Sequence, residues 1–134
     1  MRQENWESKL NNYIEEMRYK PFQYGLNDCC SFTIRAQKII TGGTLFPEFD
    51  GTYSSLKEGK EILNKLGFKT WISGCNKRLK KIDVNFAQRG DVVSMRTFDS
   101  FAMGICMGKF GFFVGEKGLI NLPREQLKLA WRID

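Results

Sequence analysis

The chain has 134 residues, of which 42% are hydrophobic and 27% are charged. This composition excludes an intrinsically disordered chain, and the length predicts one domain over residues 1–134. The formal net charge of +6 favours anionic partners such as nucleic acid, an anionic cell-wall polymer or an acidic protein surface, although a basic surface also serves solubility alone.

Membrane, secretory and metal-binding classes are disfavoured by the residue pattern. No run of about 18 apolar residues is present, so we expect no membrane-spanning helix. The first residues, Met1 to Trp6, contain no apolar segment, so we expect no signal peptide. The number and spacing of the cysteines do not suggest a disulfide framework, so we expect a reducing compartment at synthesis. The chain has no histidine and no CxxC pair, so we expect no metal site and no cofactor. Its four cysteines are Cys29, Cys30, Cys75 and Cys106.

Two helices are predicted in the first third of the chain. The first runs from about Asn5 to Met17, where apolar residues recur at helical spacing. The second runs from about Cys29 to Ile40, with Asn27 or Asp28 as its cap and Gly42 at its end. Because the second helix is apolar on most sides, we expect it to be the central buried helix.

A third helix is predicted from Ser55, which has the S-x-x-E spacing of a capping box with Glu58. Its leucines are expected to form a buried face, and Gly67 ends it. These leucines are Leu56, Leu63 and Leu66. The basic stretch 76–81 that follows is predicted to be a solvated loop.

Strands are predicted only after Gly90. They lie at about 91–95, 101–107, 109–114, 119–122 and 129–133, and Gly115 to Gly118 is typical of a hairpin turn. Helices therefore come first and strands after them. This order indicates an α+β fold in which N-terminal helices pack on a C-terminal antiparallel β-sheet.

The most informative candidate site is the start of the second helix, at Asp28, Cys29 and Cys30. A cysteine in the first turn lies where backbone N–H groups and the helix dipole stabilise a thiolate nucleophile. The same N–H groups can serve as an oxyanion hole. A cysteine in the first turn of an apolar helix also occurs for packing alone, so both interpretations stay open at this point.

Three short motifs resemble the NlpC/P60 cysteine peptidases, which have a papain-like fold. Tyr24-Gly25-x-x-Asp28-Cys29 resembles the approach to the catalytic cysteine of that family. The stretches 89–93 (RGDVV) and 102–108 (AMGICMG) resemble its two central strands, in the same order. The resemblance implies a papain-like α+β domain of the NlpC/P60 type, with a groove whose candidate residues are Tyr24, Gly25, Cys30 and Tyr53.

The nearer resemblance is to a divergent branch of this superfamily from phages and prophages, a DUF6950-like domain of unknown function. It is carried by Trp6 and Leu10, by the 21–29 segment, by Gly-Asp-Val-Val, and by the ending Gly118 to Pro123 followed by Trp131-Arg132-Ile133. With these ends the resemblance covers nearly the whole chain.

The chain departs from the peptidase pattern at the position of the catalytic base. The catalytic histidine of the family corresponds to Ala102 here, and the sequence has no histidine elsewhere. Without an imidazole, Cys29 lacks a base with a pKa near neutrality, while Asp28, Asp91 and Asp99 are ionised at pH 7 and are poor bases for a thiol. We therefore expect a pseudoenzyme in which Cys29 is vestigial.

The resemblance implies a phage-derived virion structural protein, as a tail component or tail assembly factor, that docks on other virion proteins. Such a protein would be made in the host bacterial cytoplasm and then join the virion. One alternative is an active cysteine hydrolase that uses Cys29 to cut peptidoglycan or another amide. The other is a basic nucleic-acid-binding module, motivated by the run Lys77 to Lys81, although no nucleic-acid motif accompanies it.

Overall fold

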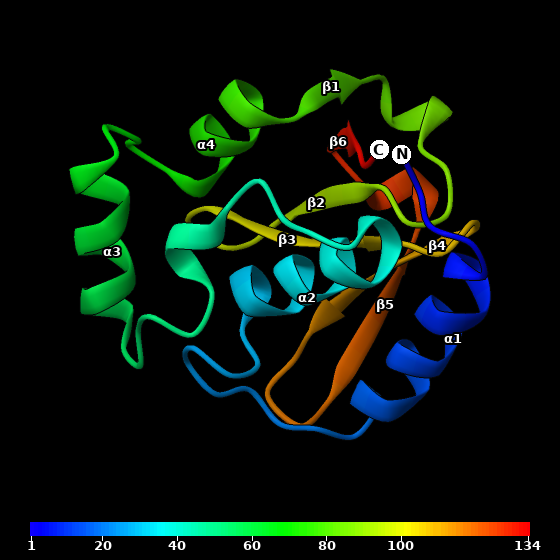
Figure 1. Ribbon diagram of the computed structural model, residues 1–134, viewed down its shortest axis with the longest axis horizontal. Coiled ribbons are helices and arrows are strands. Elements are labelled where there is room, and N and C mark those ends of the chain that lie inside the picture. The colour runs from blue at the N-terminus through cyan, green and yellow to red at the C-terminus, as the bar shows by residue number, and fades with distance from the viewer.

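The computed structural model describes residues 1–134 as a layer of helices packed against one face of a six-stranded antiparallel sheet (Figure 1). The helices are α1 (Trp6–Met17), α2 (Cys29–Thr41), α3 (Leu56–Lys65) and α4 (Trp71–Arg78). Three short 3-10 helices lie at Pro47–Phe49, Val84–Phe86 and Arg124–Gln126. None of the helices is long and apolar enough to cross a membrane.

The strands occupy the second half of the chain, in the sheet order β1-β6-β2-β3-β4-β5. Their bounds are β1 Lys80–Ile82, β2 Val92–Arg96, β3 Phe101–Cys106, β4 Phe110–Val114, β5 Leu119–Pro123 and β6 Leu129–Arg132. Every neighbouring pair is antiparallel, so the α+β class and the antiparallel sheet predicted from the sequence are confirmed.

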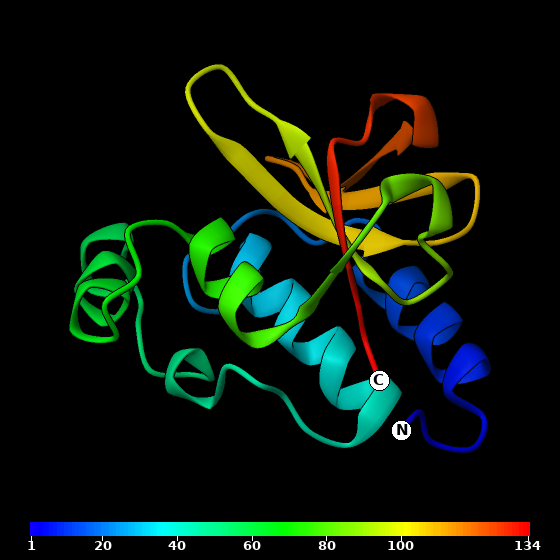
Figure 2. The same ribbon diagram turned by 90° about the horizontal axis from the view of Figure 1, so that it is seen from above.

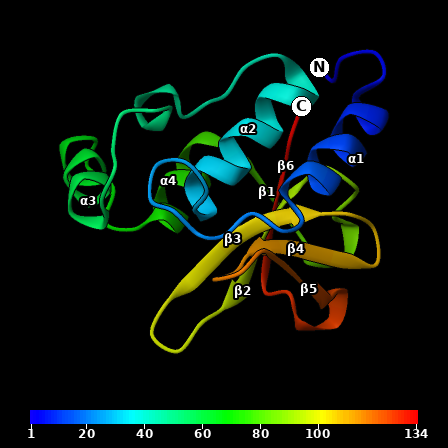
Figure 3. The same ribbon diagram turned by 90° about the horizontal axis from the view of Figure 1, so that it is seen from below.

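α2 is the central helix of the domain. Both of its ends are capped, and its sides pack against the larger hydrophobic cluster. At its start the Asp28 carboxylate accepts from the backbone N–H of Ser31 at 2.8 Å, and the Ser31 hydroxyl accepts from the N–H of Asp28 at 2.9 Å. At its end Gly42 takes the left-handed conformation, with φ of +88°, that closes a helix. α1 and α2 lie on the same face of the sheet in Figures 2 and 3, and α2 runs along β3.

The sheet separates two hydrophobic clusters. The larger one fills the space between the helices and the sheet and includes Phe32 of α2 with Met103 and Ile105 of β3. The smaller one covers the opposite face and includes Cys106 and Phe113. Because side chains alternate along a strand, each residue of β3 faces either the helices or this second cluster.

Two sequence-based expectations are wrong. The basic stretch 76–81 is not a loop: α4 covers its first residues, and β1 follows, with Lys80 paired to Arg132 of β6. A distant strand supplies the hydrogen-bonding partner here, which no local pattern reveals. The second error concerns the leucines of α3: Leu56 is 51% exposed, whereas Leu63 and Leu66 are partly buried against the larger cluster. Figure 1 shows α3 at the periphery, beside the layer of α1 and α2.

Candidate functional site

A pocket of about 630 Å³ lies where α2 begins, and we call it the Cys29 pocket. One wall comes from the first residues of α2, with Asp28, Cys29 and Cys30. The opposite wall comes from α3 and the start of α4, with Leu56 and Trp71. Sequence-distant segments therefore meet at the cysteine that the sequence singled out.

Asp28 stands at the base of this pocket and acts as a structural acceptor. It is buried, and its carboxylate accepts from the N–H of Gly25 at 2.7 Å, from the N–H of Ser31 at 2.8 Å and from the hydroxyl of Tyr53 at 2.7 Å. A carboxylate accepts about four hydrogen bonds, so these three donors use most of its capacity. Asp28 therefore caps α2 and holds the Tyr53 loop.

The surroundings of Cys29 disfavour its thiolate. Burial raises the pKa of Cys29 to about 11, the Met103 backbone lowers it in part, and the nearby Asp28 carboxylate raises it by a smaller amount. This shift is opposite in direction to that of a catalytic cysteine at a helix start. The expected thiolate stabilisation by the helix is outweighed here, because desolvation and a carboxylate both disfavour the charged sulfur.

Cys30 and Cys75, two thiols near Cys29, also have raised pKa values. Burial raises the pKa of Cys30 well above its usual value, against a hydrogen bond from Tyr53, and the pKa of Tyr53 is raised in turn by burial and by Cys30. Burial raises the pKa of Cys75 to about 12, with a further contribution from Cys29. Cys75 and Cys106 are both buried.

Ala102, the position that corresponds to the histidine of the peptidases, does not face Cys29. Its side chain packs on the second cluster together with Met95, its partner across the β2–β3 ladder. The neighbouring Met103 faces the helices and brings its backbone to the Cys29 sulfur. The sequence has no imidazole base, and a side chain at position 102 would also point away from the Cys29 thiol.

Tyr24 and Gly25 differ in their relation to the pocket. Tyr24 lines it and stacks edge-on against Phe22, with ring centroids 4.7 Å apart. Gly25 lies behind the wall, in the left-handed region with φ of +81°, where a Cβ would overlap the carbonyl oxygen of Tyr53. Gly25 thus allows two loops to approach closely, and Tyr53 itself lines the pocket.

Sequence reasoning missed the wall contributed by α3. Leu63 and Lys60 of α3 line the pocket, as does Lys69 after the helix, and their sequence positions gave no sign of it because the second helix and the third are joined by a long loop. Trp71 stacks on Phe46 and Phe49 at centroid distances of 4.6 Å and 4.9 Å and also lines the pocket. No group of three or more metal-ligating side chains is placed to hold a metal ion.

Fold and site together define an α+β domain with a cysteine of raised pKa at the start of its central helix and a pocket beside it. Residues 1–133 match the family described as "Domain of unknown function (DUF6950)", and the chain belongs to this family. No curated protein matches the chain.

Proposed function

We propose that this chain is a virion structural protein of phage origin, associated with the tail, whose domain is papain-like and of the NlpC/P60 type but lacks hydrolase chemistry. The fold assignment is supported by the order of the motifs. Asp28-Cys29 opens the helix that packs on the sheet, and Gly90-Asp91 leads into β2. The virion role rests on the resemblance to phage and prophage proteins.

The state of Cys29 is the observation that carries the non-catalytic assignment. A pKa of about 11 leaves roughly one thiol in ten thousand ionised at pH 7. The chain has no imidazole to accept the thiol proton or to protonate a leaving amine. The neighbouring carboxylate of Asp28 is occupied by three donors.

The Cys29 pocket then serves for docking on other virion proteins. Its lining combines apolar side chains with two lysines, Lys60 and Lys69. Tyr24 and Leu56 are partly exposed, at 38% and 51%, so an incoming side chain could cover them. A lysine-bearing apolar pocket suits a partner segment that carries an apolar anchor beside an acidic residue.

Alkylation of Cys29 tests the chemical part of the proposal. At pH 7 we expect iodoacetamide to modify Cys29 at a small fraction of the rate of free cysteine, and the rate to rise about tenfold per pH unit toward pH 11, because only the thiolate reacts. Peptide mass spectrometry after timed labelling measures this. Rapid labelling at pH 7, together with amide hydrolysis that Cys29→Ser abolishes, would establish the alternative of an active cysteine hydrolase.

Incorporation into particles tests the docking part. A charge placed in the pocket by Leu56→Glu is expected to reduce the amount of this protein in purified virions at least several-fold, as measured by quantitative mass spectrometry. Ile120→Glu is the matched control, because Ile120 is exposed to a similar extent, 44%, and lies on β5 outside the pocket. Equal loss in both variants, or absence of the wild-type protein from virions and from tail intermediates, would contradict the proposal.

The basic surface leaves nucleic-acid binding as the other alternative. Lys77, Lys80 and Lys81 are exposed, but they are divided between α4 and β1. Binding to DNA that weakens steeply with salt, in a filter or fluorescence assay, would favour this alternative over docking.

A further inference from the structure

The turn between β2 and β3 presents a fully exposed phenylalanine, Phe98, and we call residues 97–100 the hairpin tip. The backbone N–H of Thr97 donates to the Ser100 carbonyl at 2.9 Å, and the N–H of Ser100 donates to the Thr97 hydroxyl at 3.1 Å. These two hydrogen bonds close the turn and hold the aromatic ring out from the protein. A ring in this position gains free energy when another surface covers it.

The hairpin that carries this tip projects beyond the rest of the sheet. β2 and β3 pair over Val92–Arg96 and Phe101–Ile105. β6 pairs no farther along β2 than Ser94, and β4 pairs only with Ile105 and Cys106 of β3. Figures 2 and 3 show the hairpin extending past the neighbouring strands. The tip is therefore free to contact another molecule.

The Cys29 pocket has the chemistry that suits this tip. Apolar side chains make up most of its exposed lining, and Lys60 and Lys69, which also line it, form no ion pair. Asp99, which follows Phe98 in the tip, is likewise exposed and forms no ion pair. An apolar anchor beside an unpaired carboxylate thus matches an apolar pocket beside two unpaired ammonium groups.

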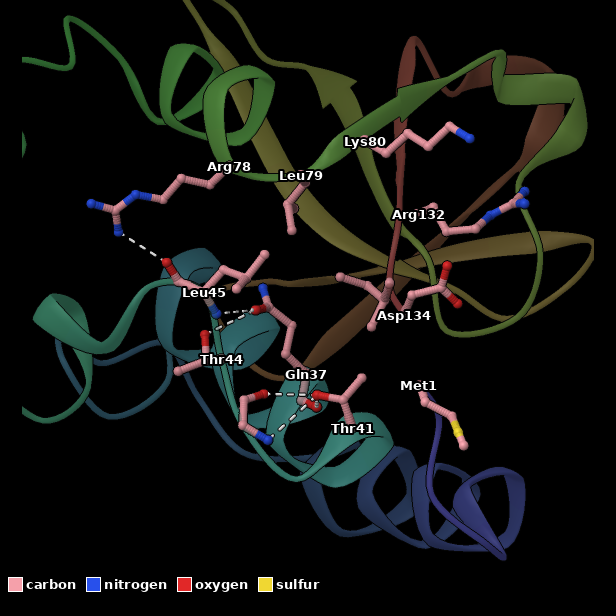
Figure 4. Close-up of a pocket in the computed structure, with 12 residues that line it drawn as sticks. Met1, Gln37, Thr41, Thr44, Leu45, Arg78, Leu79, Lys80, Arg132 and Asp134 are labelled. Carbon is pink, nitrogen blue, oxygen red and sulfur yellow. Dashed lines mark hydrogen bonds between the residues drawn. The ribbon is translucent and has the colours of Figure 1, made fainter.

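A second pocket, of about 420 Å³, lies at the last turns of α2 and suits the tip less well (Figure 4). Two of the cations that line it are already engaged within the protein. Arg78 is paired with Glu48 at 2.7 Å. Arg132 lies 3.8 Å from Asp91. Only Lys80 is left unpaired there, so charge complementarity favours the Cys29 pocket.

The tip and the Cys29 pocket lie on the same side of the molecule, because Ser100 of the tip is itself part of the pocket lining. The Phe98 ring does not fill the pocket of its own copy, since it is fully exposed. A two-fold axis beside the tip would place the tip of each copy against the pocket of the other. Such an arrangement is closed, as in most homodimers, and covers both tips at once.

We infer that the Cys29 pocket receives the hairpin tip of a second copy of this chain, so that two copies exchange their tips. Phe98 packs on the apolar lining, and Asp99 forms an ion pair with Lys60 or Lys69. The inference rests on the docking role proposed for this pocket and names the molecule that docks: a second copy, which the proposed function makes a virion protein itself.

The oligomeric state of the purified protein tests the inference. In sedimentation velocity between about 10 µM and 500 µM, we expect a reversible shift from monomer to dimer, as for a small and weak interface. Phe98→Ser is expected to weaken dimerisation at least about tenfold, because a large apolar side chain is no longer buried. Phe86→Ser is the matched control: this exposed phenylalanine lies outside the pocket, and the variant should dimerise as the wild type does.

Cross-linking tests which surfaces meet. In a mixture of ¹⁴N and ¹⁵N protein, carbodiimide is expected to join Asp99 to Lys60 or Lys69, and mass spectrometry should find cross-linked pairs that contain both isotopes. Pairs of a single isotope would show that the tip folds over its own pocket. That result, a wild type that stays monomeric, or equal loss of dimers in Phe98→Ser and Phe86→Ser would overturn the inference.

The inference and the proposed function can fail separately. A monomeric wild type, together with loss of Leu56→Glu from virions, would overturn the inference and leave docking on other virion proteins in place. Dimers with the expected cross-link, together with normal incorporation of Leu56→Glu, would support the contact between copies and contradict the proposed function.

Discussion

At the scale of single residues, the environment of Asp28 explains why a cysteine at a helix start is not reactive. The carboxylate has a structural role: it caps α2 and accepts a hydrogen bond from the Tyr53 hydroxyl. Its negative charge lies beside Cys29 and adds to the burial that raises the pKa of that thiol. One residue thus stabilises the helix and disfavours the thiolate.

Asp28→Ala is expected to lower the free energy of unfolding by about 2–4 kcal/mol, because it removes a helix cap and leaves buried donors without an acceptor. Urea unfolding followed by circular dichroism measures this. Tyr53→Phe removes one of the three donors to Asp28 and is expected to cost only about 1 kcal/mol. Equal losses for the two variants would show that Asp28 serves Tyr53 alone.

At the scale of elements, the pocket depends on how closely two loops approach. The turn before α2 and the loop before α3 meet at Gly25 and Tyr53. α3 itself has no buried residue and contributes one exposed wall of the Cys29 pocket. The wall is held through Leu63 and Leu66, which are partly buried against the larger cluster, and through the Tyr53–Asp28 contact in the loop before α3.

Gly25→Ala and Gly51→Ala separate backbone strain from steric overlap. Both glycines have positive φ, +81° and +71°, so each substitution is expected to cost about 1 kcal/mol from the backbone alone. At Gly25 the new Cβ also overlaps the Tyr53 carbonyl, whereas at Gly51 it meets nothing within 4 Å. We expect Gly25→Ala to be more destabilising by at least about 2 kcal/mol in denaturant unfolding. Similar costs at both sites would contradict the close approach.

At the scale of the whole molecule, the two ends of the chain are tied to the sheet at one buried carboxylate. Asp91 is fully buried and accepts from Arg2 at 2.9 Å and from the backbone N–H groups of Gln88 and Ile133 at 2.8 Å and 3.0 Å. Figures 1 to 3 agree that the ends lie side by side. The carboxylate of Asp91 therefore links Arg2, near the start of the chain, to Ile133, near its end.

Removal of this carboxylate by Asp91→Ala is expected to cost about 3–5 kcal/mol, because it leaves Arg2 and two backbone donors without their shared acceptor. Asp50→Ala breaks the exposed pair with Lys38 and is expected to cost less than about 1 kcal/mol. Guanidinium unfolding of both variants measures the loss in free energy of unfolding for each substitution. A cost for Asp91→Ala no larger than that for Asp50→Ala would show that the ends of the chain are not held by this contact.

Much of the fold could be predicted locally. The bounds of α1 and α2 agree with the sequence to within about a residue, because capping groups such as Asp28 and Gly42 act on neighbours three or four positions away. The strands of the second half were predicted from short apolar runs between turns, and all five were found. The lack of an imidazole beside Cys29 also follows from composition alone.

Only the tertiary structure decided the rest. β1 exists because β6 pairs with it across some 50 residues of sequence, and of the α3 leucines Leu63 and Leu66 reach the core while Leu56 stays exposed. The raised pKa of Cys29 likewise depends on burial by distant segments. The sequence by itself determined the ends of α1 and α2, the class of fold and the absence of an imidazole base, since these depend on adjacent residues or on residue type. Burial, strand pairing and pocket lining depend on which segments distant in the sequence come into contact, and a local sequence pattern does not predict those contacts.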